Sequence, residues 1–299
     1  MEFADLQIPS PITICQSDFL TQHHIELHIK RDDLIHPLLQ GNKWRKLKYN
    51  LQAAQRLHKK TLLTFGGAYS NHIHATAAAG KLLGFNTVGI IRGEAYSPLN
   101  PTLQDAQDWG MQLQYLNRID YQQKNTAECQ QALQIKYPEA YIIPEGGCNR
   151  LGMRGCAEIN NEIDNYDVIC IACGTGTSLA GIISSAKITT HVMGFAVLKS
   201  AEFLINDVNN LLHDLPPQTL ASWSINLDYH FKGYAKTSPV LLNFIKQFKS
   251  EHNIQLEPIY TGKMLYGLLD LIRQEYFPKG SKILAIHSGG LQGLRGFYF

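Results

Sequence analysis

Residues 168–178 read VICIACGTGTS. The first six are apolar, as expected of a strand that is buried on both faces of a parallel sheet. Two glycines then break the strand, and Leu179, Ile182 and Ile183 recur at the spacing of a helix. A strand that runs through a glycine turn into a helix is the repeating unit of α/β proteins, so this stretch predicts an α/β fold.

The same unit recurs along the chain. Patterns typical of strands occupy residues 25–30, 61–65, 86–91, 112–116, 141–144, 168–172, 191–197 and 282–287. Helical patterns occupy residues 42–54, 71–83, 102–109 with Thr102 as the cap, 122–136, 151–163, 178–183, 201–213, 237–252 and 262–275. This alternation predicts mostly parallel sheets with helices on both faces, and a ligand site beyond the carboxyl ends of the strands.

Composition excludes several classes of protein. The chain has 299 residues, of which 44% are hydrophobic and 17% charged, and these proportions are ordinary for a globular protein. The formal net charge of +2 gives no basic surplus, so we expect no nucleic-acid partner. No apolar run approaches the roughly 18 residues of a membrane span. Because the N-terminus also lacks a signal-peptide pattern, we expect a cytoplasmic protein without a membrane partner.

The six cysteines are scattered and do not resemble a disulfide framework. Cys170 and Cys173 spell C-x-x-C inside the predicted strand. Side chains three residues apart on a strand point to opposite faces, so this pair is expected neither to bridge nor to share a metal. Two small core residues are the favoured interpretation.

Three glycine-containing turns carry the candidate chemistry: QGNKWRK at 40–46, GGAYSNH at 66–72 and GTGTS at 174–178. The turn at 174–178 offers backbone N–H groups, hydroxyls and a helix N-terminus to an anion. It lacks the lysine of a P-loop and the G-x-G-x-x-G spacing of a dinucleotide fold, so a single phosphate monoester is the better ligand. A glycine-rich turn without any ligand is the alternative.

Lys43 opens a predicted helix, where the helix dipole disfavours a cation. A Schiff base with an aldehyde would explain its place, and a solvated surface lysine is the alternative. Ser70, Asn71 and His72 open another helix, where they can hold a substrate carboxylate or form an ordinary cap. His72 and His74 are disfavoured as a metal pair, since helix sites prefer a spacing of four.

Two tyrosines complete the candidate site. Tyr260 lies in PIYTGK at residues 258–263, directly before a predicted helix, and Tyr234 follows Gly233. Both phenols can line the same crevice as the glycine turns. Core or surface tyrosines are the alternative interpretation.

Five motifs in order resemble one family. They are GNKxRKL at 41–47, GGxxSNH at 66–72, IPxGG at 143–147, GTGT at 174–177 and YTGK at 260–263. Together they are similar to fold-type II (tryptophan synthase β-like) pyridoxal-phosphate (PLP) enzymes, in the branch of D-cysteine desulfhydrase and 1-aminocyclopropane-1-carboxylate (ACC) deaminase. The resemblance implies a three-layer αβα fold. It also implies a large domain of residues 1–48 and 153–299, a small domain of residues 49–152, and a homodimer.

The resemblance also implies residue roles. Lys43 would bind PLP as a Schiff base and move the proton at the substrate Cα. The residues implied to hold the cofactor are Lys43, Lys46, Asn71, Thr175, Gly176, Thr177, Ser178 and Thr261. The implied catalytic residues are Lys43, Ser70, Tyr234 and Tyr260, and the implied substrate-binding residues are Ser70, Asn71 and His72. Asn71 would contact the phenolic oxygen (O3′) of PLP, and no metal is implied.

Thr261 favours one activity within this branch. ACC deaminases are expected to have glutamate at this position, facing the pyridine nitrogen, and glutamine at the position of His72. A threonine hydroxyl leaves that nitrogen neutral, which suffices for elimination of a thiol from D-cysteine or a related amino acid. ACC deamination, a non-catalytic PLP-binding protein and a nucleotide-binding α/β enzyme are the alternatives. The small amino-acid substrate itself is not determined by these residues.

Overall fold

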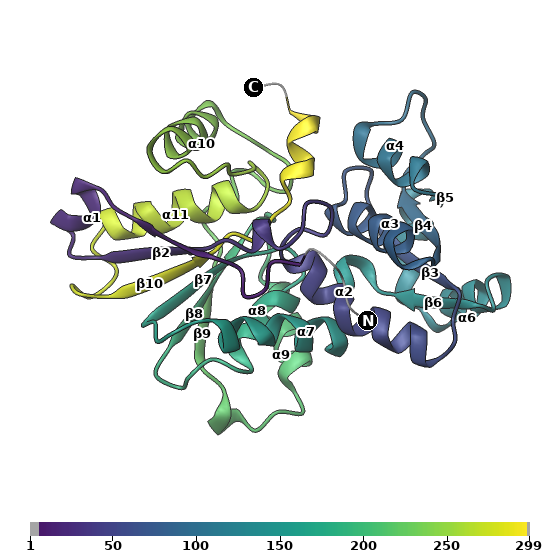
Figure 1. Cartoon of the computed structure of the whole chain (residues 1–299), viewed down its shortest axis with the longest axis horizontal. Coiled ribbons are helices and arrows are strands. Elements are labelled where there is room, and N and C mark those ends of the chain that lie inside the picture. The colour runs from purple at the N-terminus through teal and green to yellow at the C-terminus, as the bar shows by residue number, and fades with distance from the viewer. Residues whose placement is uncertain (1–5, 298–299) are drawn as a thin grey trace.

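The computed structural model describes residues 6–297 and contains two β-sheets flanked by helices (Figure 1). The strands are β1 (Ile12–Cys15), β2 (Glu26–Lys30), β3 (Thr61–Gly66), β4 (Asn86–Arg92), β5 (Met111–Leu116), β6 (Ala140–Ile143), β7 (Val168–Cys173), β8 (His191–Ala196), β9 (Ser222–Asn226) and β10 (Lys282–Ile286). The α-helices are α1 (Asp18–Gln22), α2 (Asn42–Arg56), α3 (Asn71–Leu83), α4 (Pro101–Asp108), α5 (Arg118–Gln122), α6 (Ala127–Lys136), α7 (Arg150–Ala157), α8 (Thr177–Ile183), α9 (Phe203–Leu212), α10 (Pro239–His252) and α11 (Thr261–Arg273). The fold is α/β, as predicted.

The larger sheet has six strands in the order β1-β2-β10-β7-β8-β9, and only β1 runs antiparallel to its neighbour. Its central strand β7 is buried along its whole length. Cys170 belongs to the core on one side of the sheet and Cys173 to the core on the other. Both thiols are free, so the prediction that this pair does not bridge is confirmed.

The smaller sheet has four parallel strands in the order β5-β4-β3-β6. The alanines of α3 let this helix pack closely, because Ala75, Ala78 and Ala79 lie in the core that α2 also enters. Trp44 and Leu47 of α2 are buried in the same core. All four strands lie between residues 61 and 143, and the domain boundaries predicted at 48/49 and 152/153 stay predictions.

Several local predictions differ from the structure. The cap of α4 is Asn100 rather than Thr102, because Pro101 takes the first helical position and the Asn100 side chain accepts from the next two backbone N–H groups. The predicted helix at 122–136 is divided, since Thr126 caps a new helix, α6. Strands β1 and β9 had no clear sequence signal. Both lie at sheet edges, where half-exposed residues blur the hydrophobic pattern.

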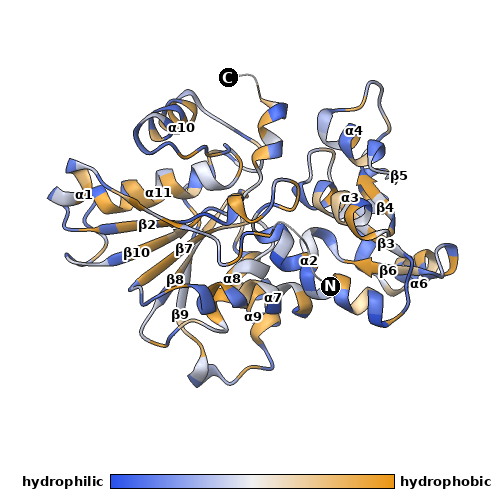
Figure 2. Cartoon of the chain, in the orientation of Figure 1, coloured by the Kyte–Doolittle hydropathy of each residue, from blue (hydrophilic) through white to orange (hydrophobic). Residues whose placement is uncertain are grey.

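Hydrophobic residues concentrate on the strands and on the helix faces that cover them, while polar residues occupy the outer helix faces and loops (Figure 2). Within residues 6–297, no helix is long and apolar enough to cross a membrane. The strand ends that carry the predicted turns meet between the two sheets.

Candidate active site

A cavity of about 610 Å³ lies where the turns after β3 and β7 meet the N-termini of α2, α3 and α8. The sequence-predicted residues on its wall are Lys43, Lys46, Ser70, Asn71, His72, Thr175, Gly176, Ser178, Tyr234 and Tyr260. Thr177 and Thr261 are fully buried and do not line it. Residues far apart in the sequence therefore meet at one site, as expected for ligand sites at the carboxyl ends of parallel strands.

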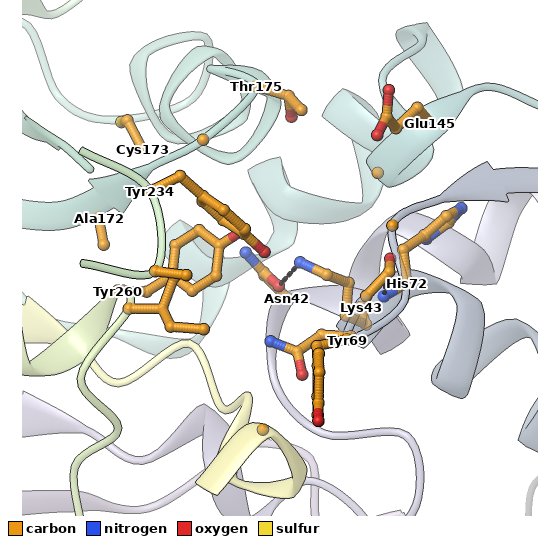
Figure 3. Close-up of a pocket in the computed structure, with 18 of the residues that line it drawn as sticks. Asn42, Lys43, Tyr69, His72, Glu145, Ala172, Cys173, Thr175, Tyr234 and Tyr260 are labelled. Carbon is orange, nitrogen blue, oxygen red and sulfur yellow. Dashed lines mark hydrogen bonds between the residues drawn. The ribbon is translucent and has the colours of Figure 1, made fainter. Parts of the chain in front are cut away.

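The N-terminus of α2 directs Lys43 into this cavity. Gly41 has a φ of +57°, and a Cβ there would lie 2.0 Å from the Ser288 carbonyl oxygen, so only glycine allows this close approach. Lys43 Nζ donates to Asn42 Oδ1 at 2.8 Å. In Figure 3 the Lys43 side chain extends toward Tyr234 and Tyr260.

Burial and the nearby Lys46 cation lower the pKa of Lys43 to about 7. Desolvation disfavours the charged form of an amine, and a second positive charge disfavours it further. Near neutral pH a large fraction of this amine is therefore unprotonated, as a nucleophile toward an aldehyde must be.

A buried ionic network holds α2 in place. The Arg45 guanidinium bonds Asp32 at 2.6 Å and Glu162 at 2.8 Å, and Lys30 Nζ lies 2.8 Å from Glu162. Burial by itself raises the pKa of Glu162, but the hydrogen bonds to Arg45 and Lys30 prevail and lower it to about 2. Because Arg45 lies two residues after Lys43, this network fixes the helical turn that carries the amine. Sequence reasoning did not identify Asp32 or Glu162.

The turn after β7 is suited to an anion. Gly176, the N-cap of α8, has a φ of +68° and provides no side-chain cap, so the first N–H groups of the helix have no capping acceptor. Lys46 Nζ donates to Thr175 Oγ1 at 3.3 Å, which places a cation beside the same turn. Thr175 Oγ1 lies 3.1 Å from the hydroxyl of Thr177. Free N–H groups, hydroxyls and a cation together match a phosphate monoester.

Ser70 is the N-cap of α3, as the simpler interpretation of the sequence proposed. Its Oγ accepts from the backbone N–H groups of His72 and Ile73, at 3.2 and 3.3 Å. The hydroxyl proton of Ser70 has no acceptor within residues 6–297, so it can be donated to a ligand in the cavity. Capping and ligand binding are therefore compatible at this residue.

His72 is a neutral imidazole of defined tautomer. The Thr64 hydroxyl donates to the Ile143 carbonyl at 2.8 Å, so it accepts from His72 Nε2 at 2.9 Å. Burial, with the Lys43 and Lys46 cations, lowers the pKa of His72 well below its usual value. His74 instead bonds Asp105 at 3.0 Å. No group of three metal-ligating side chains occurs in the described chain, residues 6–297.

Tyr234 and Tyr260 form an aromatic pair on the cavity wall, with ring centroids 6.0 Å apart and hydroxyls at 3.5 Å (Figure 3). Burial raises the pKa of both phenols, so both hydroxyls stay protonated near neutral pH. Sequence reasoning gave no role to Lys263, whose buried amine donates to the carbonyls of His230 and Gly233 at 3.0 and 2.8 Å. Lys263 thereby anchors the loop that presents Tyr234.

Thr261 is fully buried and does not lie on the cavity wall. Its hydroxyl donates to Glu257 Oε1 at 3.1 Å and accepts from the Glu257 backbone N–H at 3.1 Å. The buried Glu257 carboxylate also accepts the backbone N–H groups of residues 259–261, so it caps α11. The Thr261 hydroxyl thus uses its proton and one lone pair on Glu257. The predicted contact between Thr261 and a cofactor stays a prediction.

Comparison with known proteins identifies the family of this chain. Residues 6–289 match the family model described as pyridoxal-phosphate dependent enzyme. The chain belongs to this family. It is 33% identical to the bifunctional D-cysteine desulfhydrase/1-aminocyclopropane-1-carboxylate deaminase, mitochondrial, of Arabidopsis thaliana, over 90% of this chain and 73% of the relative. It is 32% identical to a putative 1-aminocyclopropane-1-carboxylate deaminase of Pyrococcus furiosus, over 90% of this chain and 85% of the relative.

Solved structures agree with this assignment. The crystal structure of an ACC deaminase homologue superposes with a TM-score of 0.80 and 28% identity, covering 95% of this chain and 90% of that one. Threonine deaminase isoform 2 from Solanum lycopersicum has the same fold, with a TM-score of 0.67, 18% identity and coverage of 96% of this chain and 80% of that one. The predicted family and the fold-type II architecture are confirmed.

The cavity fits the family's cofactor, PLP, at two ends. The Lys43 amine is available for the aldehyde because its pKa is about 7. Thr175 and the uncapped start of α8 suit the phosphate. Tyr69 and Arg92 also line the cavity and were not identified from the sequence, although Arg92 ends strand β4, where ligand-binding residues are common.

Proposed function

We propose that this PLP-dependent enzyme is a lyase that eliminates the β leaving group of a D-amino acid, with D-cysteine as the substrate. One D-cysteine and one water give pyruvate, ammonia and hydrogen sulfide. The observation that carries the proposal is the pairing of Thr261 with Glu257 at the start of α11. Because the hydroxyl is bound there and the carboxylate caps the helix, neither is free to protonate the cofactor's ring nitrogen, which favours α-proton removal over ring opening.

The predicted catalytic residues have proposed roles in this reaction. Bound PLP supplies the electron sink for the carbanion at the substrate Cα. The Lys43 amine binds the cofactor and, when released, takes the proton from Cα. The Ser70 hydroxyl and the N-terminus of α3 bind the substrate carboxylate.

In this proposal the tyrosine pair donates a proton, whereas Lys43 accepts one. Tyr234 and Tyr260 keep their protons near neutral pH because burial raises the pKa of both phenols. One of these hydroxyls donates a proton to the departing sulfur as the carbon–sulfur bond breaks, so the thiol leaves neutral. Lys46 and residues 175–178 would hold the phosphate of the bound cofactor.

ACC deamination is the second candidate, since the Pyrococcus furiosus relative carries that description and the Arabidopsis thaliana relative names both activities. A non-catalytic PLP-binding protein is the third, and the presence of Ser70, Tyr234 and Tyr260 around the same cavity argues against it. The predicted cytoplasmic location and homodimer stay predictions of the sequence.

The test is a substrate panel with the purified PLP-loaded enzyme. We expect keto acid and sulfide from D-cysteine and keto acid from β-chloro-D-alanine, with much slower turnover of L-cysteine, D-serine and ACC. Faster 2-oxobutanoate formation from ACC than pyruvate formation from D-cysteine would replace the proposed activity by ACC deamination. Absence of keto acid from every member would support the non-catalytic alternative.

A further inference from the structure

The C-terminal segment of the chain forms one wall of the cavity. This segment is the 3-10 helix η6 (Leu291–Gly296), which follows β10 of the six-stranded sheet and packs against α4 beside the four-stranded sheet. Gly293, Gly296 and Phe297 line the cavity. Figure 1 shows η6, in yellow, between α11 and the α3–α4 region. A residue on η6 can therefore act on both sides of the site.

Gln292 connects this segment to Asn71. Its Nε2 donates to Asn71 Oδ1 at 2.5 Å, and its Oε1 accepts from Thr102 Oγ1 at 2.8 Å. Arg295 Nη2 lies 3.5 Å from the same Oε1. A guanidinium only donates, so the oxygen of the Gln292 amide must face Arg295 and Thr102. Its nitrogen must then face Asn71, which fixes the orientation of both amides.

The consequence concerns the other end of the Asn71 amide. With Oδ1 held by Gln292, Asn71 presents Nδ2, a donor, on the opposite side. Within residues 6–297 no acceptor bonds this nitrogen, although Asn71 lines the cavity. A Cβ at Gly290 would lie 2.8 Å from Asn71 Nδ2, so the missing side chain leaves room for the amide in this position.

We propose that Gln292 is a positioning residue that holds the Asn71 amide with its N–H groups toward the phenolic oxygen of bound PLP. The proposal rests on the cofactor contact that the family resemblance implies for Asn71. It does not depend on which amino acid is turned over. Thr102 and Arg295 act indirectly, because they donate to the Gln292 oxygen and so orient the Gln292 amide.

Gln292→Glu reverses the polarity of this connection. One carboxylate oxygen keeps the bonds from Thr102 and Arg295, so the variant is expected to fold with an unchanged melting temperature. The other oxygen now faces Asn71 and can only accept, so the Asn71 amide turns and presents its oxygen to the cavity. A donated hydrogen bond at the phenolic oxygen of the cofactor is thereby replaced by a repulsive contact.

The measurements are cofactor affinity, by equilibrium dialysis of PLP against the protein, and the pH midpoint of the visible absorbance of the bound cofactor. We expect the affinity of Gln292→Glu to fall about tenfold or more, the loss associated with a hydrogen bond to a charged group. We expect the pH midpoint to move upward, because the ionised phenolic oxygen loses its donor. Gln292→Met keeps the length of the side chain but does not force the Asn71 amide to turn. We expect it to lower the affinity and raise the pH midpoint by smaller amounts.

The matched control is Gln112→Glu, which makes the same charge change at an exposed position of β5. An unchanged pH midpoint in both Gln292 variants would overturn the proposal, whether or not affinity falls, since a merely structural role would lower affinity alone. These readouts need only bound PLP. The test can therefore be carried out even if the enzyme does not turn over D-cysteine. A negative result in this test does not contradict the proposed reaction.

Discussion

The N-termini of α2 and α11 are similar in sequence and different in chemistry. Each begins after a short loop and places a lysine within its first three residues, Lys43 on α2 and Lys263 on α11. Burial is the main cause of a lowered pKa at both, to about 7 for Lys43 and about 8 for Lys263. A lowered pKa alone does not distinguish a reactive lysine from a structural one.

Their hydrogen-bond partners make the distinction. Lys263 Nζ donates to two backbone carbonyls, those of His230 and Gly233, and does not line the cavity. Among residues 6–297, Lys43 Nζ donates to the Asn42 side chain alone, and it lies on the cavity wall. An amine that satisfies two buried carbonyls cannot leave them without cost, whereas an amine that donates to one side-chain oxygen beside the cavity gives up a single bond on reaching a ligand. Reactivity therefore follows from access to the cavity as well as from burial.

Of the substitutions that test the difference between Lys43 and Lys263, Lys43→Ala should have the largest effect. The proposed elimination activity should fall roughly a thousandfold or more, because the proposal makes this amine both the attachment point of the cofactor and the base. Borohydride reduction of the PLP-loaded protein followed by peptide mapping should label wild-type Lys43 and nothing in the variant. Lys48→Ala, which replaces a lysine of the same helix that bonds Glu158, is the control and should keep both properties. Retained turnover in Lys43→Ala would contradict the assignment.

Lys263→Met should produce a smaller effect of a different kind. Two buried carbonyls lose their donor, at a cost of about 1–3 kcal/mol in the free energy of unfolding. The loop that presents Tyr234 loosens, so kcat/KM for the substrate should fall roughly tenfold, as positioning losses do. Borohydride labelling of Lys43 should be unchanged. Lys249→Met, at an exposed position of α10, is the control, and loss of Lys43 labelling in Lys263→Met would show that the two lysines are not separable.

The comparison also explains what the sequence could predict. The glycine turns, Lys43 and Ser70 were identifiable because strand, turn and helix are contiguous, and the carboxyl ends of parallel strands meet in space. The supporting contacts join distant residues: Arg45 with Glu162 across 117 positions, and Gln292 with Asn71 across 221. No local pattern marks such a pair, so Glu162 and Gln292 were not identified.

Thr261 shows the same limit within a recognised motif. The sequence predicted that Thr261 lies at the start of α11. The direction of its hydroxyl depends on Glu257, which lies four residues earlier and whose side chain caps the helix. A motif places a residue on an element. The partners that the fold supplies decide whether its side chain faces the cavity.

Lys46→Gln is the smallest expected change and tests the electrostatic part of the argument. The Lys46 cation is the second cause of the lowered pKa of Lys43, after burial, so its removal should raise that pKa while burial keeps it below the usual value for lysine. The rate at which the apo-protein captures PLP depends on the unprotonated amine. It should therefore rise with pH through a midpoint near pH 7 in the wild type and through a higher midpoint in the variant. Weaker phosphate binding lowers the whole profile without moving its midpoint, so the two effects of this substitution are separable. An unmoved midpoint would show that Lys46 acts on the phosphate turn alone.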